Sequence, residues 1–266
     1  MLRDITLGQY YQTDSVLHRL DPRVKLAGTM LFILTLFFVG NIWGYLIATL
    51  ALATVIKISR VPISFILRGM RAIAFILMIT VVFNMFLTTG EHVIVSFWIF
   101  TLSWEGIELA FYMAWRLILL IVGSSLMTLT TTPNHLTDGL EKALSSFKKI
   151  GFPVHEMSMM MSIALRFIPV LLEETDKIMK AQIARGADFE SGNIIEKAKA
   201  MIPLLVPLFI SAFRRANDLA MAMEARCYRG GEGRTKMKPL IYTKEDRWGY
   251  VVVIVFVLVT ILIGRL

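Results

Sequence analysis

Two short arginine-containing motifs are the residues of this chain best suited to recognise a partner. They are Ala184-Arg185-Gly186 and Ala225-Arg226-Cys227. A guanidinium fixed at a helix end can bind a carboxylate in a bidentate and specific way. The alternative is a local role, in which Gly186 adopts the left-handed conformation of a helix C-terminus and Arg185 favours the negative end of the helix dipole. Two such sites at the ends of two long helices favour two docking points on a two-subunit partner.

The other reactive residue types form no catalytic or metal-binding pattern. The single cysteine, Cys227, has no histidine positioned to activate it, and no HxxxH, CxxC or carboxylate pair has ligand spacing. The stretch 230–235 is glycine-rich but lacks the order GxxxxGK[ST] of a phosphate loop. The sequence therefore predicts a non-enzymatic protein with no catalytic residue, no metal site and no cofactor. The four histidines are scattered: His18, His92, His135 and His155.

Composition indicates that membrane helices must position the two motifs. Of the 266 residues, 56% are hydrophobic and only 18% are charged, and the mean hydropathy is +0.65. A soluble chain of this size would expose large apolar patches. Residues 1–23 carry several charges and do not resemble a signal peptide. Five stretches have the apolarity to span a bilayer, namely 24–39, 42–58, 72–87, 107–129 and 248–263.

The distribution of basic residues predicts the orientation of these spans. The link between the second and third spans carries four basic residues and no acidic one, whereas the 88–106 loop carries Glu91 and Glu105 and no Lys or Arg. Because basic loops stay in the cytoplasm, we expect a multi-pass protein of the cell membrane with a cytoplasmic N-terminus. With five spans, the C-terminus is extracytoplasmic. The basic residues of the link are Lys57, Arg60, Arg68 and Arg71.

The region between the fourth and fifth spans combines most of the charged residues with short apolar runs. Arginine and proline interrupt these runs, so we expect long helices at the cytoplasmic face of the membrane over residues 134–147, 154–185 and 194–226. The predicted fold is an all-α polytopic membrane protein with about five transmembrane helices and three cytoplasmic-side coupling helices. We divide it into a membrane region with four spans (1–129), a coupling-helix region (130–247) and a C-terminal transmembrane helix (248–266).

Part of the apolar surface of the coupling helices is expected to receive a membrane partner. Flexible thioether side chains suit a surface that repacks against different partners. Core packing is the alternative role for each methionine. The candidate contact residues are Met157, Met160, Met161, Leu208, Ile210 and Phe213.

The chain resembles the transmembrane T component (EcfT) of energy-coupling factor transporters, which import vitamins and metal ions. The resemblance covers nearly the whole chain and rests on the segment Leu20-Asp21-Pro22-Arg23-Val24-Lys25-Leu26, on Thr131-Thr132-Pro133 and on the two Ala-Arg motifs. The family signatures read Ala-Arg-Gly, so Cys227 departs from the second one. The resemblance implies that two ABC ATPase subunits bind the coupling helices through Arg185 and Arg226. It also implies that a membrane substrate-binding (S) component docks on their membrane-facing side.

On this basis the predicted function is that of a transmembrane scaffold and coupling subunit of an ECF-type ABC importer. It would transmit the ATP-driven motion of two ATPases to an S component for uptake of a vitamin or micronutrient. It would hydrolyse no ATP and bind no nucleic acid. The alternative is a self-contained secondary transporter or channel, for which Arg116 and Glu108 in the fourth span are the ionisable candidates.

Overall fold

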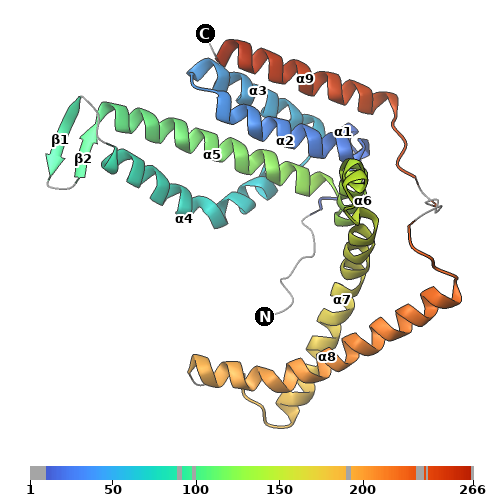
Figure 1. Ribbon diagram of the computed structural model, residues 1–266. Helices are drawn as coiled ribbons and strands as arrows, with labels where there is room; N and C mark the ends of the chain where they lie inside the picture. The colour runs from blue at the N-terminus through green and yellow to red at the C-terminus, as the bar shows by residue number, and fades with distance from the viewer. Residues whose placement is uncertain are drawn as a thin grey trace. The chain divides into compact units, whose positions relative to one another are not determined.

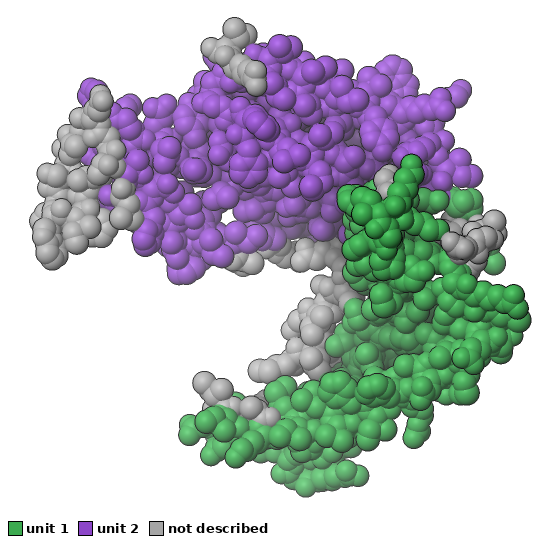
Figure 2. Space-filling view, viewed as in Figure 1, with its two compact units in different colours: residues 1–7, 140–239 green, residues 8–139, 240–266 purple. Residues whose placement is uncertain are grey.

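The computed structural model describes residues 10–88, 92–97, 100–189, 193–231, 237 and 239–264. Helices dominate it (Figure 1). The chain forms two compact units, coloured separately in Figure 2. Unit 1 comprises Met1–Leu7 and Leu140–Pro239, and unit 2 comprises Gly8–Gly139 and Leu240–Leu266. Each unit has its own internal packing and is described separately.

Unit 2 is a bundle in which α2 and α3 lie between α9 and α5, and α4 packs along α5 (Figure 1). Its core is formed by side chains such as Leu36, Tyr45 and Leu126. Small residues bring the helices close together, since a Cβ at Gly123 would lie 2.7 Å from the Phe32 ring. The helices are α1 (Val16–Arg19), α2 (Pro22–Phe38), α3 (Ile42–Ser59), α4 (Ile63–Leu87), α5 (Trp104–Thr130) and α9 (Lys244–Gly264).

Polar side chains inside the bundle fix helix ends. Asn41 caps α3 by accepting the Gly44 N–H at 3.1 Å, and its amide donates to the carbonyl of Ile263 at the end of α9, 2.7 Å away. Arg116 donates to the Tyr45 hydroxyl at 2.9 Å and to the carbonyl of Val39 at 3.3 Å. Val39 is the residue that ends α2, so Arg116 has a structural role in closing this helix.

A short antiparallel hairpin joins α4 to α5, and the sequence analysis did not predict it. Its strands are β1 (Val93–Phe97) and β2 (Phe100–Ser103), with an irregular register between Val93 and Val95. Ser103 ends the hairpin and caps α5 by accepting the Gly106 N–H at 3.1 Å. The protein is therefore an all-α membrane protein, apart from this small β-hairpin among the residues that the structure describes.

Unit 1 contains the two longest helices that the sequence predicted and the end of a third, α6, which begins in unit 2. α7 (Val154–Ala184) and α8 (Ile194–Ala225) agree with the predicted ranges 154–185 and 194–226 to within one residue. The first predicted helix, 134–147, is α6 (Pro133–Ala143) followed by a 3₁₀ helix over Leu144–Ile150. The tighter turn ends at Gly151, whose φ of +86° favours glycine.

Four described helices are long and apolar enough to cross a membrane by length and composition alone: α3, α5, α7 and α9. α4 contributes the shorter apolar stretch Ile73–Phe86, and α2 has 17 residues, so their roles as spans remain predictions. α7 is among these four helices because its first half is apolar. The half that follows Pro169 carries charged residues. That α7 is a coupling helix and not a span therefore remains a prediction.

Candidate functional site: the ends of the two long helices

The first Ala-Arg motif forms the C-terminus of α7. Arg185 is the capping residue, with φ −88° and ψ 5°. Gly186 follows in the left-handed region at φ +91°, and its N–H donates to the carbonyl of Ile183 at 2.9 Å. The N–H of Ala187 donates to the carbonyl of Gln182 at 3.0 Å. This pair of bonds is the Schellman arrangement, which satisfies the last free carbonyls of a helix.

The second motif ends α8 in the same way despite its cysteine. Arg226 caps the helix with φ −92° and ψ 13°. Cys227 takes the left-handed conformation at φ +54°, and its N–H donates to the backbone carbonyl of Glu224 at 2.8 Å. The N–H of Tyr228 donates to the backbone carbonyl of Met223 at 3.0 Å. The two motifs therefore have one cap geometry, and Cys227 adopts a conformation that few non-glycine residues tolerate.

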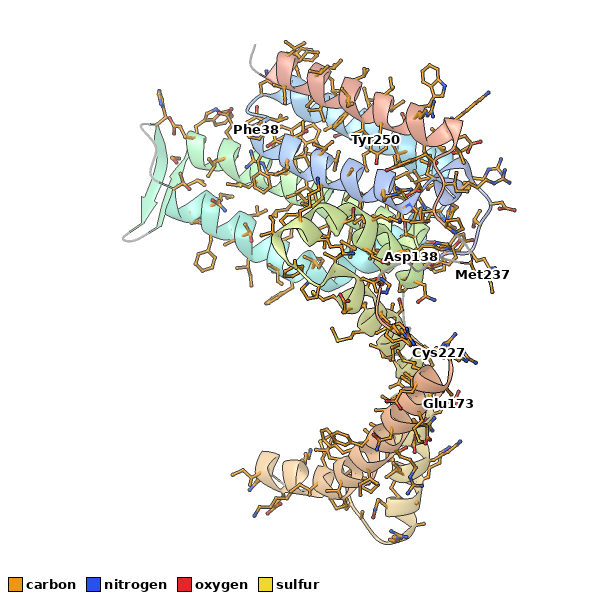
Figure 3. The ribbon with its side chains drawn as sticks, turned by 45° about the vertical axis from the view of Figure 1, so that its right-hand side comes forward. Phe38, Asp138, Glu173, Cys227, Met237 and Tyr250 are labelled. Atoms are coloured by element: carbon orange, nitrogen blue, oxygen red, sulfur yellow. The ribbon has the colours of Figure 1, made fainter. Side chains whose placement is uncertain are left out.

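Both motifs are open to a partner. Ala184, Arg185 and Gly186 are exposed, and so are Ala225, Arg226 and Cys227. Neither guanidinium forms an ion pair with another residue that the structure describes. α7 and α8 cross, so that their C-termini are separate ends of the unit, with Cys227 marking the end of α8 (Figures 1 and 3). The cap role and the docking role are thus compatible, because the backbone makes the cap and the arginine side chain is exposed.

A polar clasp fixes the crossing of α7 and α8, and the sequence analysis missed it. The carboxylate of Glu174 on α7 accepts hydrogen bonds from the Ser211 hydroxyl and from the Arg215 guanidinium of α8, the latter at 2.9 Å. These two donors, Ser211 first, hold the pKa of Glu174 below its ordinary value. Ser211 and Arg215 are four residues apart and share one face of α8, a spacing that could have indicated a polar contact.

A second polar contact ties the start of α7 to α6. His155 Nδ1 lies 3.0 Å from Glu141 Oε1, and the Ser158 hydroxyl donates to Glu141 Oε2 at 3.0 Å. Gly231, shortly after α8, packs against the His155 ring so closely that a Cβ there would collide with it. His155, one of the scattered histidines of the sequence, therefore helps to fix the start of α7 and the chain that follows α8.

The predicted membrane-partner residues are mostly accessible. Met157, Met160, Met161, Ile210 and Phe213 are exposed, with Phe213 at 70%. Leu208 is half-buried, because it lies one helical turn from Ser211 on the face of α8 that meets α7. The exposed apolar side chains of α8 continue on its other face, over Ile202, Leu205, Val206 and Phe209.

Comparison with known proteins places this chain in a well-populated group. A family model described as CbiQ, cobalt transport protein, matches residues 13–237. An energy-coupling factor transporter transmembrane protein EcfT from Clostridium kluyveri is 52% identical over 263 residues, covering 98% of this chain and 97% of that protein. The EcfT of Ruminiclostridium cellulolyticum is 54% identical over 246 residues, or 92% of each chain. The EcfT of Bacillus subtilis is 46% identical over 246 residues, or 92% of this chain and 93% of that protein.

Proposed function

The chain belongs to the family of energy-coupling factor transporter transmembrane proteins (EcfT), and on this premise we propose that it couples two ABC ATPase subunits to a membrane S component. The ATPases hydrolyse ATP, and the S component holds a vitamin or another micronutrient. The chain itself transmits motion between them. In this proposal the N-terminus and the coupling helices lie on the cytoplasmic side and the C-terminus lies outside.

The observation that carries the proposal is the repeated, exposed cap of α7 and α8. Two helices of 31 and 32 residues are clasped at their crossing and end in the same Schellman geometry. Each end presents one arginine at the negative end of the helix dipole, where its charge is stabilised. A rigid pair of helices with two equivalent basic ends suits a partner made of two similar subunits, each offering a carboxylate.

The exposed apolar faces of the same helices support the second half of the proposal. Phe213, Ile210 and Met160 are too apolar to favour water and are available for helix packing. An S component packed on this face would move with the coupling helices. Binding of one partner at the helix ends and of another along the helices explains how a subunit without a catalytic pattern can take part in transport.

Charge reversal at both helix ends tests the proposal. The chain is co-expressed with two ABC ATPases and an S component, and each partner is quantified after purification through a tag on the chain. Arg185→Glu with Arg226→Glu should weaken ATPase capture by about 30-fold or more, because a lost charge-assisted pair costs about 2–5 kcal/mol.

The matched control is Arg166→Glu with Arg214→Glu, which makes the same charge change at exposed positions of the same two helices. This control should retain both ATPases. Unchanged ATPase capture in the Arg185/Arg226 variant, or equal loss in the control, would contradict docking through the helix ends.

The alternative function, a self-contained secondary transporter or channel, would need charged side chains that serve an ion or substrate. Arg116 instead bonds to Tyr45 and to the carbonyl that ends α2. Uptake by the chain alone in proteoliposomes, without ATPases, would support this alternative over the coupling role.

A further inference from the structure

One segment of seven residues, Leu20–Leu26, contacts residues near two of the points where the chain passes between the two units, at 139–140 and at 239–240. The chain leaves unit 2 after Gly139 and returns to it at Leu240. The segment includes the start of α2, and its side chains and backbone reach residues near both points. All of these contacts lie within unit 2.

On the outgoing side, the segment fixes the end of α5 and the middle of α6. The Lys25 ammonium, only 8% exposed, donates to the carbonyl of Thr130 at 2.9 Å and to that of His18 at 3.2 Å. Thr130 is the last residue of α5. Nine residues later, Gly139 packs so tightly on α2 that a Cβ there would lie 2.8 Å from the Pro22 Cβ.

On the returning side, the segment fixes the residues that lead into α9. Asp246, 1% exposed, accepts the backbone N–H of Asp21 at 2.7 Å and that of Thr243 at 2.7 Å. Arg23 binds Asp21 through two hydrogen bonds, of 3.0 and 2.8 Å. The same guanidinium donates to the carbonyl of Leu240 at 3.3 Å, the first residue of the returning chain.

Aromatic contacts extend this network. The Arg23 guanidinium lies over the ring of Tyr242, 3.8 Å from its centroid. The Tyr242 hydroxyl lies 3.4 Å from that of Tyr250 on α9, which is labelled in Figure 3. The returning chain is thus held by its backbone at Leu240 and by its side chain at Tyr242.

The four charged residues Asp21, Arg23, Lys25 and Asp246 make up what we call the anchor cluster. Two carboxylates and two cations balance one another. Apart from the pairing of Arg23 with Asp21 and Tyr242, most of their partners are backbone groups. Charged groups withdrawn from water are tolerated only where such partners are in place, so the cluster has one favourable arrangement and resists deformation.

We propose that the anchor cluster is the point where force on the coupling helices enters the membrane bundle. The four residues act as positioning residues, because they hold the α5–α6 and α8–α9 connections and touch no partner themselves. A pull on either connection then moves α2 and the helices packed on it. This inference rests on the coupling function proposed above, and it predicts that a loosened cluster lets ATP hydrolysis continue while transport falls.

Neutralising one buried carboxylate tests the anchor. The complex of the chain, two ATPases and an S component is reconstituted in proteoliposomes, and uptake and ATP hydrolysis are measured on the same sample. Asp246→Asn should assemble and hydrolyse ATP close to the unmodified rate, with uptake per ATP reduced about tenfold, the order expected when a buried charged hydrogen bond is lost. Its matched control is Glu245→Gln, one residue earlier and exposed, which should leave uptake per ATP unchanged.

A second, conservative variant guards against simple misfolding. Arg23→Lys keeps the charge but cannot bind Asp21 and the Leu240 carbonyl through one planar fork, so an intermediate uptake per ATP is expected. Unchanged uptake per ATP in Asp246→Asn overturns the anchor. Parallel loss of assembly, hydrolysis and uptake in both variants also overturns it, since it indicates a purely structural role. Failure of the coupling function itself would be recognised separately, by absence of ATP-dependent uptake with the unmodified chain.

Discussion

The cysteine at the end of α8 offers a quantitative test of the repeated cap. Cys227 has φ +54°, whereas Gly186 occupies the equivalent position of α7 at φ +91°. Cys227→Gly should strengthen the cap of α8, and Gly186→Ala should weaken the cap of α7. A Cβ at Gly186 would have open space around it, so the expected cost is conformational and involves no clash.

The size of the effect follows from two opposing contributions. A non-glycine residue in the left-handed region costs about 1–2 kcal/mol, which a change to glycine removes. Glycine also has greater freedom in the unfolded chain, and this offsets about 0.4–1 kcal/mol of that gain in stability. Cys227→Gly should therefore stabilise the cap by about 0.5–1 kcal/mol, or about two- to fivefold in its opening equilibrium. Gly186→Ala should cost at least as much, because alanine must also shift φ from +91° towards about +57°.

Hydrogen exchange of the cap amides measures these changes directly. The informative groups are the N–H of Tyr228 after α8, which donates to the carbonyl of Met223, and the N–H of Ala187 after α7, which donates to the carbonyl of Gln182. In each variant the unmodified helix end is the internal control. Faster or unchanged exchange at Tyr228 in Cys227→Gly, after correction for intrinsic rates, would refute the left-handed cap at this position.

Three further predictions concern the coupling helices. Glu174→Gln should weaken the α7–α8 contact, which cross-linking of the two helices measures. The pKa of Glu174 is lowered in the folded protein. The contact in the unmodified protein should therefore be fully present above the ordinary glutamate pKa of about 4.3 and should be lost as the pH falls through the lowered pKa. Ile210→Arg should reduce S-component capture in a pull-down and leave ATPase capture intact, whereas Met160→Leu should be nearly silent; equal loss of both partners would indicate unfolding of the helix. A cysteine at Ser145, with Cys227 replaced by serine, should react with membrane-impermeant reagents from the cytoplasmic side, and labelling from outside would reverse the proposed orientation.

Local sequence signals were sufficient for the long helices. Asn193 and Glu196 form a capping box at the start of α8, and Gly186 follows the end of α7. Residue types that favour helix ends therefore indicate where α8 begins and where α7 ends. Helical periodicity between these ends does not depend on distant contacts. Two other positions suited to a labelling test of the orientation lie outside the described residues: Glu91, expected to react from outside, and Gly192, expected to react from the cytoplasmic side.

Features that depend on distant residues were not predictable. Nothing near Asp246 in the sequence indicates that its carboxylate accepts the N–H of Asp21, 225 positions away. The left-handed conformation of Cys227 likewise contradicts the usual preference for glycine, and only the hydrogen bonds of the cap reveal it. The β1–β2 hairpin was missed because residues 88–106 were interpreted only as a loop between two spans, and apolar runs as short as its strands do not by themselves identify a strand.

The bond between Asp246 and Asp21 has a consequence for the order in which the protein can be made. During synthesis at about 5–20 residues per second, roughly 11–45 s pass between the emergence of Asp21 and that of its acceptor, since 225 positions separate them. Asn41 also waits for Ile263 at the end of α9. The first membrane helices therefore remain without their final partners until the last helix has been inserted. A chain that stops before α9 leaves the backbone N–H of Asp21 without the carboxylate that accepts it in the complete protein.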